Sequence, residues 1–396
     1  MKLFQRLLVA PAALGLLAPI TANANEVNFK AISNYSDVDD IEFANSFDNT
    51  FENNVEFEPL IAGGEGMVHD HDTDSFSETT TASFSADFAI GAVDGKGIST
   101  GVTDGDEDLQ AGYGFQIDLN TSFTGEDSLD ISLDAGNAGG AIGEFDLNGA
   151  HATAGSDALS VDGVSYTFPV GDSTTVIVGD NTDGSALFTT ACAYGGPGNT
   201  LDDCANVNAG ITGGGLTVGA AYDFGNGFTV ATGVQTTETS ILTKETSDSY
   251  ALNAAYIDDS YGVSVTYSTN ETGTNGVDSD TYTALNAYYS FDNGMSISAG
   301  YEVGSLGNHA AAADETLAYF VGVSGEVGPG ELGAAIGTAG SMTEASSTIT
   351  ELMQYEAYYS YALNDGMTVT PLIYVQEQSG TASDQTGIMV KTSFSF

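Results

Sequence analysis

A cluster of histidines and aspartates at positions 69–74 has the chemistry of metal ligands. Imidazole nitrogens suit zinc, iron or copper, whereas carboxylate oxygens suit calcium or magnesium. The aspartate spacing is that of a calcium-binding loop, but Ser75 and Thr81 stand where such a loop needs glycine and glutamate. Two interpretations stay open: a site for calcium or another metal, and a solvated acidic linker with no cofactor at all. The candidate ligands are His69, Asp70, His71, Asp72 and Asp74.

The chain has two cysteines, Cys192 and Cys204, in a loop rich in glycine and asparagine. In an exported protein such a pair is expected to form a disulfide. Closing so short a loop is worth roughly 3 kcal/mol in the chain-entropy model. The loop could be a stapled surface loop. It could also fold inward and constrict a pore, which would place Asp202 and Asp203 near the narrowest point.

Catalytic chemistry is not expected. A catalytic barrel needs a histidine base beside a nucleophile or a water-activating acid. In the region 81–396 the histidines are His151 and His309, and each stands in a connection rich in alanine and glycine. Neither is accompanied by a Gly-x-Ser-x-Gly or similar nucleophile motif, so we predict that the protein is not an enzyme.

The composition of the 396 residues excludes several classes of protein. Six basic residues stand against 55 acidic ones, and this balance cannot build the basic face that nucleic acid requires. An acidic disordered chain would lack aromatic residues, which make up 10% here. Apolar runs long enough for a transmembrane helix are absent from the sequence. The abundance of Gly, Tyr, Phe, Ser and Thr instead favours an all-β fold.

Residues 1–24 have the features of a secretory signal peptide. Lys2 and Arg6 precede a short apolar stretch, and Ala22-Asn23-Ala24 is a small-residue cleavage site. We expect residues 25–80 to form an acidic, flexible segment, either periplasmic or a partial plug. Residues 81–396 then form the main domain.

The second half of the chain reads as hairpins. Between Met295 and Val303 every odd position is apolar and every even position is small or polar, which predicts a strand with two different environments. Asn-Gly and Asp-Gly pairs at 224–227, 291–294 and 363–366 predict tight turns. Longer polar connections lie between the short ones, so short and long connections alternate along the chain.

This alternation predicts an all-β, transmembrane antiparallel barrel of 16–18 strands with short periplasmic turns and long extracellular loops. The predicted location is the outer membrane of a Gram-negative-type bacterium. We expect 11 strands after residue 214. Before it we expect strands at 82–92, 111–123, 127–135, 142–148, 158–168 and 173–191, the last being one strand or two.

The chain ends on a strand whose outer face carries Phe394 and Phe396. This ending resembles the signal by which the barrel assembly machinery recognises outer-membrane proteins. Period-2 alternation also assigns polar side chains to the lumen. The predicted pore-lining residues are Thr229, Gln235, Ser296, Ser298, Glu302, Thr368, Thr370, Tyr374, Gln376 and Lys391.

The segment Leu119–Leu129, followed by Leu133–Gly136, resembles an element of cyanobacterial outer-membrane porins. These belong to the OprB-type carbohydrate-porin superfamily and are often called iron uptake porins. The signal peptide, the stretch Cys192–Cys204 and the ending Val390–Phe396 are similar to those of marine picocyanobacterial porins. The resemblance covers essentially the whole chain and implies a trimeric or monomeric barrel that passes small hydrophilic solutes. Larger members carry an S-layer-homology domain, of which Ile32–Val38 resembles only the opening, so wall anchoring is not expected.

The predicted function is passive diffusion of sugars, amino acids and inorganic ions, with iron implied by the resemblance alone. Anion-selective pores need rings of lysine or arginine, whereas residues 25–396 contain four lysines and no arginine. We therefore expect a neutral to cation-preferring pore. The alternative is a structural or divalent-metal-collecting surface protein with a plugged lumen. Expected partners are outer-membrane lipid, lipopolysaccharide, the barrel assembly machinery and, in a homotrimer, further copies of the chain.

Overall fold

The computed structural model describes residues 80–94, 109–137, 140–145, 147, 157–243, 246–271, 279–307, 315–345, 348–349, 351–378 and 384–396. Of the 18 strands in these ranges, 16 form a closed antiparallel barrel, and β14 (Met342–Ala345) and β15 (Thr348–Ile349) form a small hairpin beside β12. The barrel strands are β1 (Thr80–Asp94), β2 (Gln110–Thr121), β3 (Ser128–Gly136), β4 (Ser160–Val170), β5 (Thr174–Asp180), β6 (Leu216–Asp223), β7 (Phe228–Thr236), β8 (Ser249–Ile257), β9 (Tyr261–Asn270), β10 (Asp280–Ser290), β11 (Met295–Ser305), β12 (Glu315–Val327), β13 (Gly330–Thr338), β16 (Met353–Asn364), β17 (Met367–Gln376) and β18 (Gln385–Ser395). Within the described ranges, no helix is long and apolar enough to cross a membrane.

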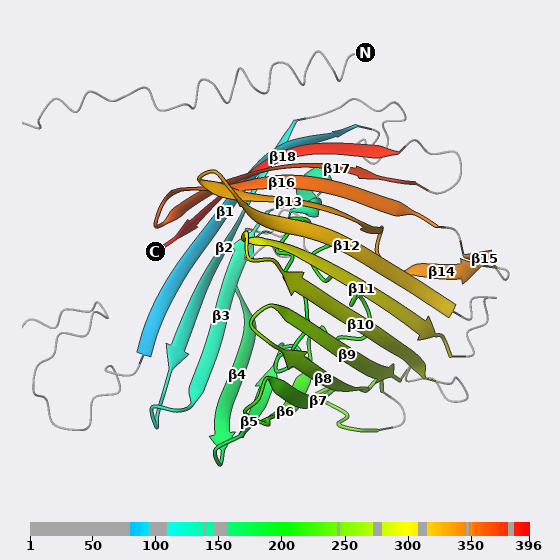
Figure 1. Ribbon diagram of the computed structural model, residues 1–396. Helices are drawn as coiled ribbons and strands as arrows, with labels where there is room; N and C mark the ends of the chain where they lie inside the picture. Colours follow the sequence, from blue (N-terminus) through cyan, green and yellow to red (C-terminus); the bar gives the residue numbers. More distant parts are fainter. Residues whose placement is uncertain are drawn as a thin grey trace, which may run out of the picture. The chain divides into compact units, whose positions relative to one another are not determined.

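The barrel is closed by the pairing of its first and last strands. Each barrel strand pairs with the next, β13 pairs directly with β16, and β18 pairs with β1. At the last rung, Phe84 and Phe396 exchange two backbone hydrogen bonds of 3.0 Å. Figure 1 shows the red β18 lying beside the blue β1. The predicted fold class is therefore confirmed.

Short and long connections lie at opposite ends of the barrel. Because consecutive strands alternate in direction, every short turn lies at the same end as the junction of Phe84 and Phe396. The turn Phe291–Gly294 is formed as predicted, and Gly294 has a φ of 80°, which only glycine adopts without strain. All 11 strands predicted after residue 214 are present.

The two faces of the wall have inverted polarity. On β9 the outward Tyr261, Val263 and Val265 are exposed, while the inward Ser264 and Thr266 are buried. Aromatic rings gather on the outside near the short turns, where they contact one another in neighbouring pairs. These rings belong to Phe84, Phe123, Tyr166, Phe168, Tyr222, Phe224, Phe228, Tyr256, Tyr261, Tyr289, Phe291 and Phe396.

One predicted strand is replaced by a different element, and another is shorter than predicted. The region predicted as strand 142–148 instead contains the 3-10 helix η2 (Gly140–Glu144), followed by an isolated bridge at Phe145. Ile142 and Phe145 are three positions apart and both buried, a spacing that suits one helical turn rather than a strand. The strand predicted at 173–191 ends at Asp180, since Asn181 adopts a left-handed φ of 52° and the chain leaves the wall.

Candidate functional site: the barrel lumen

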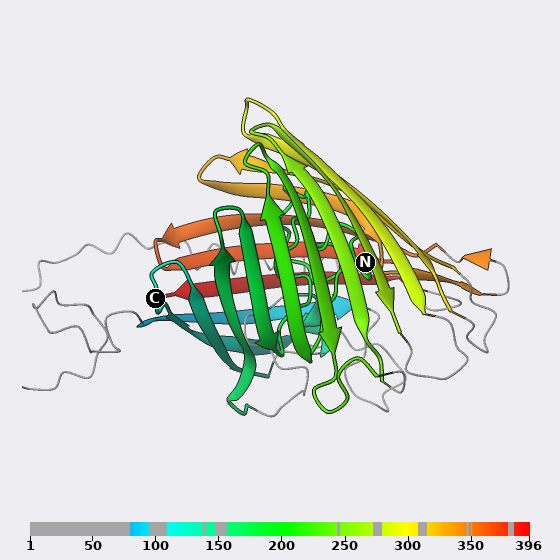
Figure 2. The same cartoon turned by 90° about the horizontal axis from the view of Figure 1, so that it is seen from below.

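A long segment between β5 and β6 lies inside the barrel. We call residues 181–215 the inner loop. Figures 1 and 2 both show this green segment enclosed by the strands. Its backbone and side chains hydrogen-bond to inward-facing residues along one continuous arc of the wall and to β16. The wall partners are Gln235 on β7, Asn253 on β8, Ser264 and Ser268 on β9, Asn286 on β10, Ser298 and Glu302 on β11, Ser324 on β12 and Glu356 on β16.

Glu302 is the most heavily bonded anchor of the inner loop. Its carboxylate accepts the backbone N–H of Asn208 at 2.7 Å, that of Ala209 at 2.8 Å and the side-chain amide of Asn208 at 2.9 Å. The Glu302 side chain is 0% exposed. Three N–H donors satisfy a buried carboxylate in its charged form. Glu302 faces inward as predicted, but the inner loop covers it.

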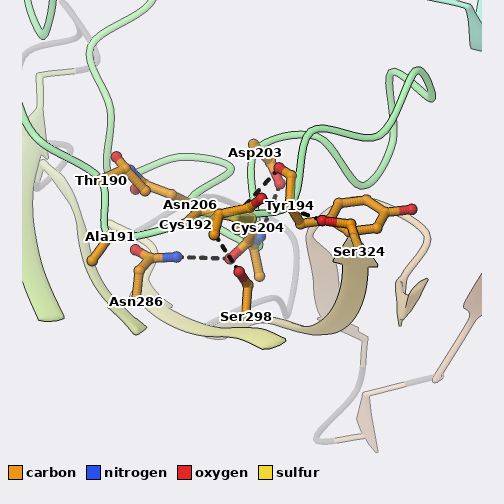
Figure 3. The surroundings of a disulfide bond; sticks show 12 residues. Thr190, Ala191, Cys192, Tyr194, Asp203, Cys204, Asn206, Asn286, Ser298 and Ser324 are labelled. Atoms are coloured by element: carbon orange, nitrogen blue, oxygen red, sulfur yellow. Dashed lines mark hydrogen bonds between the residues drawn. A yellow bond between two sulfur atoms is a disulfide. The ribbon is translucent and has the colours of Figure 1, made fainter. Parts of the chain in front are cut away.

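Cys192 and Cys204 form a disulfide within the inner loop. Figure 3 shows this disulfide beside the inward-facing side chains of Asn286 and Ser298. Asn286 donates to the carbonyl of Cys204 at 2.8 Å, and Ser298 accepts the N–H of Ala193 at 2.9 Å. A Cβ added to Gly300 would collide with the Cys204 carbonyl, so a glycine lets the loop backbone touch the wall.

Asp202 and Asp203 differ in their surroundings although they are neighbours. Asp202 is exposed, whereas Asp203 is half-buried and accepts the N–H of Ala205 at 2.9 Å. Burial raises the pKa of Asp203 to about 7, and the negative charges of Asp202 and Glu302 act in the same direction. Their part in a constriction stays a prediction.

A second inward segment packs against the inner loop. Thr200 of the inner loop donates to Glu144 of η2 at 2.9 Å, and Lys391 Nζ lies 5.9 Å from the centre of the Phe145 ring. Apolar side chains of both segments form one cluster with inward-facing side chains of β12, β17 and β18. Its members include Ile142, Phe145, Leu147, Tyr194, Leu201, Phe320, Leu372, Tyr374 and Met389. Part of the lumen is therefore filled.

The opposite wall of the barrel is polar and acidic. We call the inward-facing polar side chains of β1 to β4, in the half nearest the short turns, the polar wall. Asp118 accepts from Gln116 at 2.8 Å and from Ser132 at 2.7 Å, and Asp130 accepts from Asn120 at 2.6 Å. The members are Ser83, Ser85, Asp87, Gln116, Asp118, Asn120, Ser128, Asp130, Ser132, Asp134, Ser165 and Thr167.

The predicted lumen residues all occupy inward-facing register positions. Gln235 donates to the carbonyls of Thr182 and Gly213, so it supports the root of the inner loop. Whether solutes pass these side chains stays a prediction. Three of the predicted pore-lining residues, Gln235, Ser298 and Glu302, bond to the inner loop. The other seven are Thr229, Ser296, Thr368, Thr370, Tyr374, Gln376 and Lys391.

Other predicted residues lie on the outer face or outside the described ranges. The ring of Phe394 contacts that of Phe88 edge-on, with 6.0 Å between the ring centres. The ring of Phe396 stacks on that of Phe84, with 5.8 Å between the centres. The signal peptide 1–24, almost all of segment 25–80 and the ligand set His69, Asp70, His71, Asp72 and Asp74 lie outside the described residues. Among the residues that are described, no three His, Cys, Asp or Glu side chains are grouped to hold a metal ion.

The sequence reasoning missed the polar wall and Glu356. The signal for the polar wall was present, because Asp118, Asn120, Asp130 and Ser132 alternate with apolar neighbours along their strands. No local pattern distinguishes Glu356, because its surroundings come from the inner loop and η2.

No family model and no curated protein matches the chain. Solved structures do match it. OprB from Pseudomonas putida is similar with a TM-score of 0.59 and 10% identity, over 81% of this chain and 94% of OprB. OmpT from Vibrio cholerae without loop L8 matches with a TM-score of 0.55 and 13% identity, over 80% of this chain and 100% of OmpT. A mutant Rh. blastica porin matches with a TM-score of 0.53 and 14% identity, over 80% and 100%. This likeness shows the fold, which is the 16-strand barrel of outer-membrane porins.

Proposed function

We propose that the protein is an outer-membrane porin, a water-filled channel for passive diffusion of small hydrophilic solutes. The observation that carries this proposal is a closed barrel that is apolar outside, polar inside and narrowed by its own inner loop. An apolar exterior with aromatic rings near the ends suits a bilayer, and a closed sheet leaves no unpaired edge in lipid. The solutes are sugars, amino acids and inorganic ions, with iron following only from the sequence resemblance.

The solute path runs between the inner loop and the polar wall. The hydrogen bonds between the inner loop and the wall involve β6 to β12 and β16, whereas the polar wall occupies β1 to β4 across the barrel. Asp118 and Asp130 are half-buried and accept hydrogen bonds from neutral donors, so two acidic side chains lie at the lumen surface. This placement supports a path lined by hydroxyl, amide and carboxylate groups.

The same charges support cation preference. Lys391 is the sole Lys, Arg or His in the part of the chain that the structure describes. Negative side chains lining a narrow path raise the local concentration of cations and lower that of anions.

A planar-bilayer measurement in a potassium chloride gradient tests this function. We expect stepwise conductance, a cation-preferring reversal potential, and a smaller potential for the double variant D118N/D130N. The variant D259N/D292N removes the same charge from exposed short turns and serves as the control. Absence of conductance, or an anion-preferring reversal potential, contradicts the proposal.

The second candidate is the structural or metal-collecting surface protein with a plugged lumen. The apolar cluster formed by Ile142, Phe145 and Leu201 inside the barrel favours it, because packed side chains leave no water path there. Deletion of residues 25–80 separates the candidates if the wild-type protein is silent. Conductance that appears only after this deletion supports a plug formed by that segment. Location in the outer membrane, assembly by the barrel machinery and a homotrimer are part of the proposal.

A further inference from the structure

Glu356 is a buried carboxyl group with an incomplete set of hydrogen bonds. It lies on the inward face of β16, beneath the inner loop, and is 5% exposed. The Tyr194 hydroxyl donates to its Oε1 at 2.7 Å. Its Oε2 is buried and has no hydrogen-bond partner. The two oxygens of this group are therefore in different situations.

The inner loop lies directly against the unpartnered oxygen. A Cβ added to Gly198 would collide with Glu356 Oε2 and would lie 3.2 Å from Glu144 Oε1. Two carboxyl groups from η2 and β16 thus face the same small space beside the loop backbone. The charged and titratable groups around Glu356 are Tyr194 and Asp202 of the inner loop, Glu144 of η2, Glu331 of β13, Tyr358 of β16 and Tyr374 of β17, with Lys391 of β18 beside the Phe145 ring.

Glu302 shows what a charged anchor of the same loop requires. Its carboxylate receives three N–H donors. Glu356 receives the Tyr194 hydroxyl on Oε1 and interacts with the side-chain amide of Gln354, but no backbone N–H of the inner loop reaches it, and it faces a second carboxyl group. A buried, partly bonded carboxylate costs free energy that the neutral acid avoids. Glu356 therefore lacks the set of N–H donors that Glu302 has.

We propose that Glu356 holds a proton on Oε2 while the inner loop is seated, and that loss of this proton releases the loop from β16 and widens the solute path. Glu356 is a positioning residue, since it acts through the loop and not on the solute. The widening rests on the proposed channel function, whereas the seating of the loop does not.

Amide hydrogen exchange of the full-length protein measures how firmly the inner loop is held against the wall, a contact that we call the seat. This measurement needs no channel assay. The readout is the protection factor of inner-loop amides, corrected for intrinsic exchange, from pH 5 to pH 9. The parent carries D203N, because Asp203 also titrates in this range. We expect protection to fall about tenfold per pH unit over the range in which Glu356 is ionised in the released loop but still protonated in the seated one, and to level off above that range. Protection should stay constant in the parent with E356Q.

A second variant keeps the test decisive if E356Q does not fold. Y194F removes the donor to Oε1, which destabilises the charged form, so release should move to higher pH. Equal pH profiles in the parent, E356Q and Y194F overturn the proposal. So does protection in the parent that stays constant over the whole range from pH 5 to pH 9.

Conductance of the same variants separates this proposal from the channel function. We expect the conductance of the parent to rise over the pH range in which protection falls, and that of E356Q to stay constant over it. Loop release without any conductance at any pH leaves the proton on Glu356 supported and contradicts the porin function.

Discussion

The two sides of the lumen use polar side chains in different ways. Along β7 to β12 the inward polar groups bond to the inner loop, as Glu302 and Asn286 do. On β1 to β4 the polar wall bonds mainly within itself, as Asp118 does with Gln116 and Ser132. The same strand alternation therefore produces a surface that holds the inner loop on one side and a polar surface beside the proposed solute path on the other.

This difference separates two effects of negative charge. The Glu302 carboxylate accepts three N–H donors, all of them from the inner loop, so this group holds the loop in place. Asp118 and Asp130 are half-buried beside the proposed path, so the channel proposal assigns them an effect on ion selectivity. Substitutions on the seat should change the size of the path, and those on the polar wall its selectivity.

The largest effect is expected from E302Q. The substituted amide can accept through one oxygen only, so at least one N–H of the inner loop loses its acceptor. Hydrogen bonds to a buried charge contribute roughly 1.5–3 kcal/mol each, so the seat should weaken by about 3 kcal/mol. Single-channel conductance should rise and its ion preference should change little. S296A is the control, because Ser296 bonds to Ser324 and not to the inner loop. Unchanged conductance in E302Q would contradict the conclusion that Glu302 holds the inner loop in the lumen.

Removal of the disulfide by C192S/C204S is expected to have the next largest effect. Opening this loop costs about 3 kcal/mol in the chain-entropy model, but the anchors at Glu302 and Asn286 remain. We expect increased current noise and faster amide exchange in the inner loop, with the barrel strands unaffected. Exchange that accelerates equally in the strands contradicts a role confined to the loop.

Asp203 should give a smaller dependence on pH. Its pKa in the folded protein is raised by burial from 3.8 to about 7. Ionisation is therefore less favourable in the folded loop than in the unfolded chain. The stability of the seat is greatest below about pH 4, falls as pH rises to about 7, and is constant above that value. D203N should remove this part of the pH dependence, measured by amide exchange in an E356Q background.

The smallest effect is expected from salt. The Debye length falls from about 10 Å at 0.1 M to about 3 Å at 1 M, so the charges of the polar wall are screened. The cation preference should decline over this range, while the relative conductances of the wild-type protein and E302Q stay the same. A preference that is insensitive to salt indicates ion contacts closer than a diffuse field.

The sequence predicts the barrel well and its contents poorly. Alternation and Asn-Gly turns are local signals, and they place the strands from β6 to β18 and the inward face of Ser298 and Thr370. The segment at 140–147 is not predicted to leave the wall, and the inward fold of the Cys192–Cys204 loop is predicted only as one of two alternatives. The apolar residues of both segments pack across the lumen and show no period of their own. Glu144 and Thr200 meet over a long sequence distance. Pairs of this kind cannot be read from spacing.

The pairing of β1 with β18 has a consequence for biogenesis. Ala89 and Lys391 face each other in this pair although they stand about 300 positions apart, the kind of contact that forms slowly because the intervening chain must first be ordered. Ring closure therefore waits until β18 has been made. A nascent or truncated chain that lacks β18 has two sheet edges with unpaired backbone groups, and these groups can pair with other chains. Residues 385–396 therefore close the open sheet into a barrel and remove the two edges at which it could aggregate.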